Sequence, residues 1–193
     1  FTISGADAGN YTLAQPVTTA DITPASLTIN GVTADSRVYN ALTNATLSGT
    51  ASLVGVFVGD TVNLDETSVS ANFNNKNVGT NKAVTVLGYT INGTDAGNYT
   101  LAQPSGLTAD ITAASLNVTG VTASNKVYDA TTAALLSGGS LVGVIGGDAV
   151  SLTTTTTGVF DTKNVGVGKT VTGVGFTISG ADAGNYTLAQ PVT

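Results

Sequence analysis

The chain has 193 residues and a net charge of −6, and only 9% of its residues are charged. Cysteine and histidine are both absent, which excludes disulfide bonds, thiolate metal sites and catalytic pairs that use a histidine base. The six basic residues are scattered along the sequence, so no positive stripe is available for nucleic acid or for an anionic membrane surface.

A motif of twelve residues lies near the start of the chain and returns twice. Gly-x-Asp-Ala-Gly-Asn-Tyr-Thr-Leu-Ala-Gln-Pro occurs at residues 5–16, 93–104 and 180–191, and its tyrosines are 88 and 87 residues apart. Residues 1–18 and 176–193 are identical. A period of this length exceeds the roughly 20–50 residues of solenoid rungs and propeller blades, and it suits a small β-sandwich domain. We therefore expect a tandem array in which each copy closes its own core.

The repeat divides the chain into four segments. Residues 1–25 are expected to be the C-terminal part of a preceding repeat, 26–104 a first module, 105–114 a linker strand between modules, and 115–193 a second module. Closing strands without their own module would present unpaired edges. We therefore expect residues 1–25 either to begin a rearranged module or to pair with a neighbouring copy.

Alternation of apolar and polar residues predicts short strands in both copies. Leu27 and Ile29 alternate with polar neighbours, and Leu116 and Val118 repeat the pattern. Glycine, asparagine and aspartate interrupt these runs at the spacing of sandwich turns, and the Asp-Ala-Gly-Asn part of the motif allows one short helical turn at most. The predicted fold class is all-β, with tandem small β-sandwich (Ig-like) modules arranged end to end as an elongated rod.

One short segment carries a family resemblance. Lys126-Val-Tyr-Asp129, followed by Ala-Thr-Thr, resembles the YDG domain of large bacterial exported proteins, and Gly147-Asp148, Lys163-Asn-Val-Gly166 and residues 180–188 agree with it. The resemblance covers roughly residues 26–104 and 115–191. The glycine of the family motif is Ala130 here, and the other copy reads Tyr39-Asn40-Ala41. We interpret this segment as a turn with a local cap and not as a chemical site.

The resemblance also implies a setting and a role. Similar domains occur as repeats in filamentous-haemagglutinin-like adhesins and biofilm matrix proteins, which implies an extracellular location on a bacterial cell surface or in a biofilm matrix. The expected function is a structural stalk or spacer that extends a distal adhesive region. A self-assembling extracellular filament subunit and a polysaccharide-binding module are the alternatives.

The expected partners follow from the same reading. They are the neighbouring repeats of the same chain, with other copies of the chain or extracellular polysaccharide as alternatives. Nucleic acid and membrane insertion are not expected.

Several residues recur at matching places in the copies, yet none is assigned a catalytic, cofactor-binding or metal-binding role. We expect no enzyme activity and no cofactor. The recurring acids fit turn caps, with calcium ligation as the alternative; they are Asp7/Asp95/Asp182, Asp21/Asp110 and Asp60/Asp148.

Recurring lysines and aromatic residues raise three further questions. Lys76 and Lys163, each followed by asparagine, fit solvated turn lysines, with a lysine–asparagine crosslink as the alternative. Tyr39 and Tyr128 are expected in the core or half-buried, with sugar stacking as the alternative. Phe73 and its counterpart Phe160 are the expected aromatic anchors of the two cores.

Overall fold

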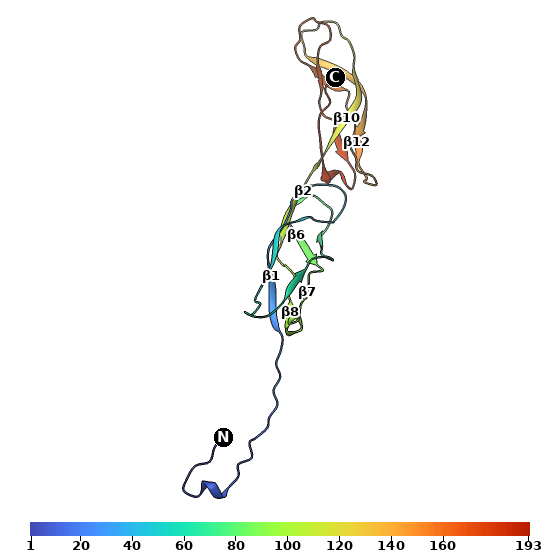
Figure 1. The fold of residues 1–193 in the computed structure, drawn as a ribbon. Helices are drawn as coiled ribbons and strands as arrows, with labels where there is room; N and C mark the ends of the chain where they lie inside the picture. Colours follow the sequence, from blue (N-terminus) through green and yellow to red (C-terminus); the bar gives the residue numbers. More distant parts are fainter.

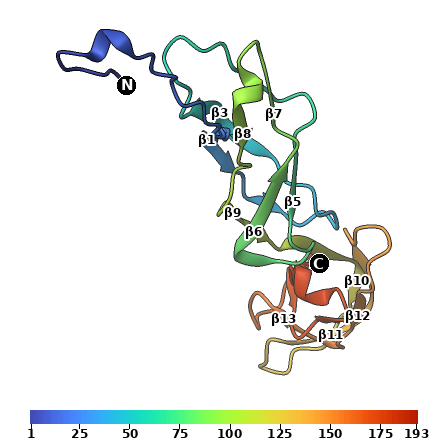
Figure 2. The same cartoon turned by 90° about the horizontal axis from the view of Figure 1, so that it is seen from below.

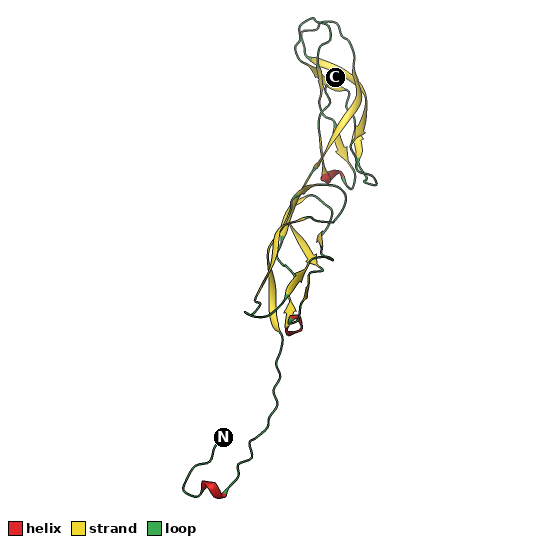
Figure 3. Ribbon diagram, in the orientation of Figure 1, coloured by secondary structure: helices red, strands yellow, loops and turns green.

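The computed structural model describes residues 1–193 and consists of strands, loops and three single helical turns (Figures 1 and 3). The prediction of an all-β fold in tandem copies is confirmed. The first module contains β1 (Ala25–Ala34), β2 (Arg37–Val38), β3 (Leu47–Val54), β4 (Asn63–Asp65), β5 (Ser70–Phe73), β6 (Gly79–Leu87), β7 (Thr90–Asn92), β8 (Tyr99–Leu101) and β9 (Thr108–Thr112). The second contains β10 (Ala114–Ala123), β11 (Ala133–Val142), β12 (Ser151–Thr153), β13 (Thr157–Phe160), β14 (Val171–Gly173), β15 (Thr177–Ser179) and β16 (Tyr186–Leu188).

The three helical turns all come from the repeated motif. They are η1 (Ala8–Asn10), η2 (Ala96–Asn98) and η3 (Ala183–Asn185), and they confirm the single short turn predicted for Asp-Ala-Gly-Asn. At three residues each, they are far shorter than a helix that crosses a lipid bilayer.

Residues 1–24 lie apart from both modules as an extended segment (Figure 1). Within this segment the side chain of Gln15 accepts a hydrogen bond from the amino group of Phe1 and donates one to its carbonyl, both at 2.7 Å. No residue of the segment pairs with a strand of either module. The expectation that residues 1–25 begin a rearranged module is therefore wrong. Pairing with a neighbouring copy stays a prediction.

The first module is built from three small sheets. β1 lies at the centre of a three-stranded sheet, antiparallel to β3 and parallel to β8, and a second sheet has the order β2-β9-β6-β5. β4 and β7 form a separate antiparallel ribbon. Leu27 and Ile29 of β1 and Val84 and Val86 of β6 are buried, while the residues between them are exposed, as the alternation predicts.

β9 revises the expected division of the chain. The segment 105–114, expected as a linker strand, contains β9, which pairs antiparallel with β6 and parallel with β2. Ile111 at its centre is only 1% exposed. A single residue, Ala113, separates β9 from β10. The same extended segment therefore completes the first module and leads directly into the second (Figure 2).

The second module repeats the central pairing of the first, but its β11 also pairs with β13 and joins what are separate sheets in the first module. β10 pairs antiparallel with β11 and parallel with β16, as β1 does with β3 and β8. Its main sheet has the order β14-β13-β11-β10-β16, and β12 and β15 form the ribbon. No strand of this sheet occupies the place that β9 has between β2 and β6.

The apolar core is not divided at the module boundary. One cluster of 11 buried residues runs from the first module into the second, where it includes Leu116 and Tyr186. A second cluster of 5 residues, among them Leu136 and Phe176, fills the rest of the second module. The expectation that each copy closes its own core is therefore wrong at this junction. Phe73 is buried as expected, whereas Phe160 is half-buried.

Candidate functional site: the junction between the two modules

The repeated motif folds into a clamp at the end of each module. Gly180 has a φ of +122°, and a Cβ at this position would lie 2.2 Å from the carbonyl oxygen of Ala149, so only glycine fits. Two residues later, Asp182 Oδ2 accepts the backbone N–H of Ala149 at 3.0 Å. The side chain of Gln190 bonds both backbone groups of Phe176, in the manner of a strand partner. The motif therefore fastens the loop before β12 to the strand β16.

Tyr186, the tyrosine of this motif, connects the clamp to the first module. Its hydroxyl donates to Asp148 Oδ2 at 2.6 Å and accepts the backbone N–H of Ile145 at 3.1 Å. Tyr39 of the first module donates to the same Asp148 oxygen at 2.8 Å. The rings of Tyr39 and Tyr186 pack edge to face, with centroids 5.4 Å apart. Tyr39 is 3% exposed, so the expectation of a core tyrosine is confirmed here.

Lys76 supplies the positive charge of the junction. Its Nζ lies 2.9 Å from Asp148 Oδ1 and 2.9 Å from Asp182 Oδ1, so one lysine of the first module joins two carboxylates of the second. It also lies 5.9 Å from the centre of the Tyr39 ring. The side chain of Asp148 is 2% exposed, and a carboxylate so deeply buried needs these donors to remain charged. The expectation of a solvated turn lysine is wrong for Lys76.

Backbone contacts complete the junction. The side chain of the buried Asn185 accepts the backbone N–H of Val78 at 2.9 Å, and its amide nitrogen lies 3.4 Å from Asn77 Oδ1. The direct passage from β9 to β10 lies beside this contact, since the backbone N–H of Tyr39 donates to the carbonyl of Thr112 at 2.8 Å. The two modules thus meet through a covalent strand connection, a shared apolar cluster and a hydrogen-bonded group of charges, which we call the junction cluster: Tyr39, Lys76, Asp148, Asp182, Asn185 and Tyr186.

The electrostatics of the junction cluster follow from these contacts. Hydrogen bonds from Tyr186 and Lys76 hold the pKa of Asp148 below its ordinary value. The backbone N–H of Ala149 and then Lys76 lower the pKa of Asp182. Burial, together with the bond to Asp148, raises the pKa of Tyr186 to about 12. The two carboxylates therefore stay ionised and Tyr186 stays neutral at ordinary pH, which is the protonation state that the hydrogen bonds require.

The counterparts of these residues lie at the two free ends of the pair. In the first module Tyr99 bonds Asp60 and the backbone of Phe57, and Asp95 accepts the N–H of Thr61 at 2.8 Å. These repeat the bonds of Tyr186, Asp148 and Asp182, but without a lysine. In the second module Lys163 is exposed and makes no ion pair, and Tyr128 is 54% exposed. Each end of the pair thus presents one half of a junction cluster.

The turn that carries the family resemblance is capped as expected. Asp129 Oδ1 accepts the N–H of Thr131 at 2.9 Å, and Asn40 Oδ1 accepts the N–H of Leu42 at 3.0 Å. The next residue has a left-handed backbone in both copies, with φ of 64° at Ala130 and 63° at Ala41. The glycine of the family motif therefore corresponds to a backbone conformation that favours glycine.

The expectation that the recurring acids cap their own turns is wrong: Asp95 and Asp182 make no such cap and instead accept backbone N–H groups of distant residues. Asp110 Oδ1 accepts the N–H of Asn81 at 2.8 Å, and thereby fastens β9 to the turn at the start of β6. Asp7 and Asp21 lie in the N-terminal segment, and both are exposed. No three acidic side chains come together in the manner of a metal site.

The fold and the junction together define a tandem pair of small all-β modules joined by one inter-module contact. Comparison with family models identifies the modules: the model of the YDG domain matches residues 23–106 and 112–193. The chain belongs to the YDG domain family, with two copies in tandem. Comparison with curated proteins and with solved structures gives no match.

Proposed function

We propose that this chain is a structural spacer, a pair of stalk repeats from a bacterial cell-surface or biofilm-matrix adhesin that extends a distal adhesive region in the extracellular space. The single observation that carries this proposal is the junction. A spacer must hold successive modules in a fixed direction, and a flexible linker would not do so. Here β9 passes into β10 across one residue, and the junction cluster adds hydrogen bonds and ion pairs between the two modules.

The repeat explains how such a spacer could gain length. Every contact in the junction cluster is made by residues of the repeated sequence, so one more copy adds one more identical joint. The low charge of the chain and its many threonine and asparagine side chains fit a hydrated surface with little dependence on salt. In this account the array forms a rod whose reach is its function.

The proposal is tested by measuring length against the number of modules. Arrays of two, four and eight modules are expressed, and their maximum dimension is measured by small-angle X-ray scattering. A stiff spacer should lengthen in direct proportion to the number of modules. A flexible string of modules should lengthen with about the square root of that number, and this result would contradict the proposal.

A glycan-binding screen on the same arrays separates the spacer from the alternative of a polysaccharide-binding module. The exposed ring of Tyr128 is the aromatic surface that would favour sugar stacking. The spacer account expects no glycan retention. Retention that is lost in Tyr128→Ala would support the polysaccharide-binding module instead.

A further inference from the structure

The chain enters the first module at one end and leaves it at the other. β1 begins at Ala25, directly after the extended N-terminal segment, and β9 ends at Thr112, next to the start of β10 in the second module (Figure 1). Tension along the chain therefore reaches the module through these two strands. In the proposed spacer such tension arises when the ends of an array are pulled apart, so only the source of the tension rests on the proposed function.

β1 is held on both sides by neighbouring strands. It forms six residue pairs with β3 and three with β8. Tension pulls β1 along its own axis, and the hydrogen bonds of a β-ladder run across that axis. A lengthwise pull therefore loads these bonds together, in shear, and does not break them one after another.

The ladder between β1 and β3 also contains a steric barrier to sliding. Its register shifts at Gly31. A Cβ at Gly31 would overlap the carbonyl oxygen of Thr50, and a Cβ at Gly49 would overlap that of Gly31. When β1 slides towards its N-terminus, Val32 and then Thr33 reach this place, and both carry a Cβ. Sliding of β1 is therefore opposed by side-chain overlap as well as by hydrogen bonds.

β9 is also an interior strand of its sheet, but its ladders are shorter. It forms two residue pairs with β2 and three with β6. Two side-chain bonds reinforce them: Ser36 Oγ accepts the backbone N–H of Asp110 at 2.9 Å, and Asp110 Oδ1 accepts that of Asn81 at 2.8 Å. Ile111 is 1% exposed and anchors the strand in the apolar cluster. Because the same tension acts on β1 and β9, the more weakly attached β9 should slide first.

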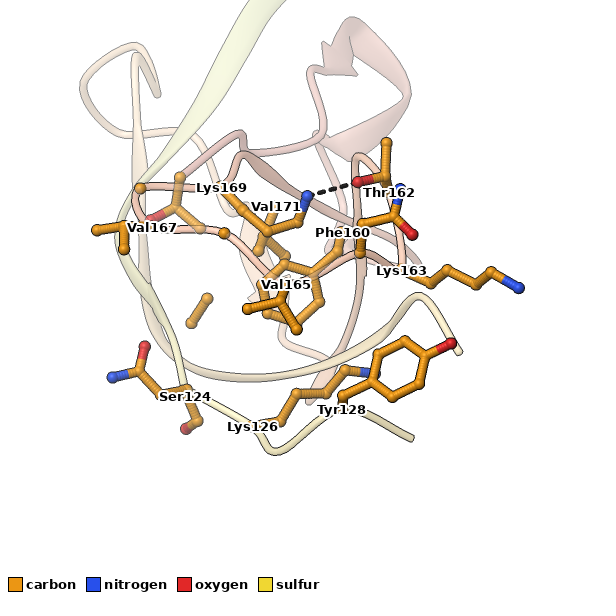
Figure 4. Close-up of a pocket in the computed structure, with 16 residues that line it drawn as sticks. Ser124, Lys126, Tyr128, Phe160, Thr162, Lys163, Val165, Val167, Lys169 and Val171 are labelled. Atoms are coloured by element: carbon orange, nitrogen blue, oxygen red, sulfur yellow. Dashed lines mark hydrogen bonds between the residues drawn. The ribbon is translucent and has the colours of Figure 1, made fainter. Parts of the chain in front are cut away.

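The second module shows that the rest of the fold keeps its pairing without this strand. The sequence ends at Thr193, before any counterpart of β9, and the place of β9 is there an open groove beside Phe160 and Lys169 (Figure 4). β10 still pairs with β11 and β16. Tyr39, beside β9, is 3% exposed, and its counterpart Tyr128 is 54% exposed. Withdrawal of β9 therefore uncovers the core at Tyr39 and leaves β1 in its sheet.

We propose that the first module is a tension-bearing clamp in which force along the chain loads β1 and β9 in shear, and β9 slides out before β1. The module therefore resists a lengthwise pull better than a sideways pull, which breaks a ladder pair by pair. When the load exceeds the resistance of β9, Ile111 leaves the core while β1 still holds β3 and β8. The weakest point of the spacer is then the strand that leads into the second module.

Single-molecule pulling on the full chain tests the direction of loading, because the chain has no cysteine of its own. Handles are attached at Thr23→Cys and Ser115→Cys for the lengthwise pull, and at Thr23→Cys and Val58→Cys for the sideways pull; all three positions are exposed. Val58 follows the end of β3 that lies beside the first half of β1, so the sideways pull peels these strands apart. The rupture force should be about twofold or more higher in the lengthwise pull. Unfolding of residues 23–115 should then lengthen the tether by roughly 300 Å.

Two matched substitutions test which strand slides first. Ile111→Val and Ile29→Val make the same change in the same apolar cluster, one on β9 and the other on β1. At a constant lengthwise force, Ile111→Val should raise the rate of the first rupture about two- to tenfold, because its contacts are lost as β9 slides. Ile29→Val should leave this rate within about twofold, since β1 is still paired at that point.

Two results would overturn the proposal. Equal rupture forces in the two pulling directions would show that the module is not loaded in shear. An acceleration by Ile29→Val that equals or exceeds the acceleration by Ile111→Val would show that β9 does not slide first. Both measurements concern one module, so their outcome is independent of the stiffness of the joint, which the scattering of longer arrays measures.

Discussion

Two alanines with a left-handed backbone show how the fold constrains a single residue. Ala41 and Ala130 both adopt φ near 64°, in a turn that Asn40 or Asp129 caps. A residue with a Cβ costs about 1–2 kcal/mol in this conformation. Glycine adopts this conformation without that cost. Its greater conformational freedom in the unfolded chain offsets only part of the resulting gain in stability.

Ala130→Gly should therefore raise the free energy of unfolding by roughly 0.5–1 kcal/mol. Urea denaturation of the variant and the parent chain gives this difference directly. Ala133→Gly is the matched control, because Ala133 lies within the strand β11 and should lose stability on the same change. A loss of stability in Ala130→Gly would show that the positive φ is not the constraint.

The pKa of Asp148 gives the junction a defined dependence on acid. A carboxyl group whose pKa is lowered on folding stabilises the folded state above its ordinary pKa of 3.8, and this contribution is lost as the pH falls through the lowered value. Asp148→Asn removes the titrating group. The difference in unfolding free energy between the parent chain and Asp148→Asn should therefore be constant well above pH 3.8 and shrink below it.

Thermal or urea unfolding at several pH values measures this difference. Asp35→Asn is a suitable control, since Asp35 lies outside the junction cluster and its side chain bonds only the hydroxyl of Ser48. A difference for Asp148→Asn that does not depend on pH would mean that Asp148 is not held in its charged form by Tyr186 and Lys76.

At the scale of elements, β9 completes the second sheet of the first module. The sequence Thr-Ala-Asp-Ile-Thr is buried between β2 and β6 in one copy and free in the N-terminal segment. Its contribution can therefore be measured within one chain. Ile111→Ala should cost about 2–5 kcal/mol, because it leaves a cavity in the cluster that spans both modules.

Ile22→Ala is the control that matches this change most closely. It makes the same substitution in the same five-residue sequence, and Ile22 is fully exposed in the single chain. At a protein concentration low enough to keep the chain monomeric, Ile22→Ala should leave the midpoint of urea denaturation unchanged. Equal effects of the two substitutions would contradict the assignment of β9 to the first module.

The strands and turns could be predicted from sequence because their signals are local. Alternation placed Leu27, Ile29, Leu116 and Val118 correctly on buried strand faces. The assignment of β9 could not be made in this way, since the pattern of Ala109 and Ile111 shows a half-buried strand but not which module buries it. Only the pairing with β2 and β6 decides that.

The junction cluster was beyond sequence reasoning for a related reason. Lys76 and Asp148 are 72 residues apart, and Tyr39 and Asp148 are 109 apart. Their contacts depend on the orientation of one module against the next, which no local pattern encodes. The recurrence of the lysine, the acids and the tyrosine in both copies was a signal, but it fitted turn capping equally well.

At the scale of the whole molecule, the central claim is that neighbouring modules are held in one fixed orientation. The continuous segment from β9 to β10 joins the modules without a flexible linker, and the junction cluster adds two ion pairs between them. In Figure 1 the two modules follow one another, with residues 1–24 extending beyond the first. If the claim is correct, removing the charge of Lys76 should loosen the joint while leaving each module folded.

Electron paramagnetic resonance distance measurement between spin labels on Thr67→Cys and Ser151→Cys tests this most directly, because both residues are exposed and lie in different modules. The account predicts one narrow distance distribution in the parent chain, a broad one after Lys76→Met, and a narrow one after Lys163→Met, the counterpart that makes no ion pair. A broad distribution in the parent chain, or no change with Lys76→Met, would contradict it.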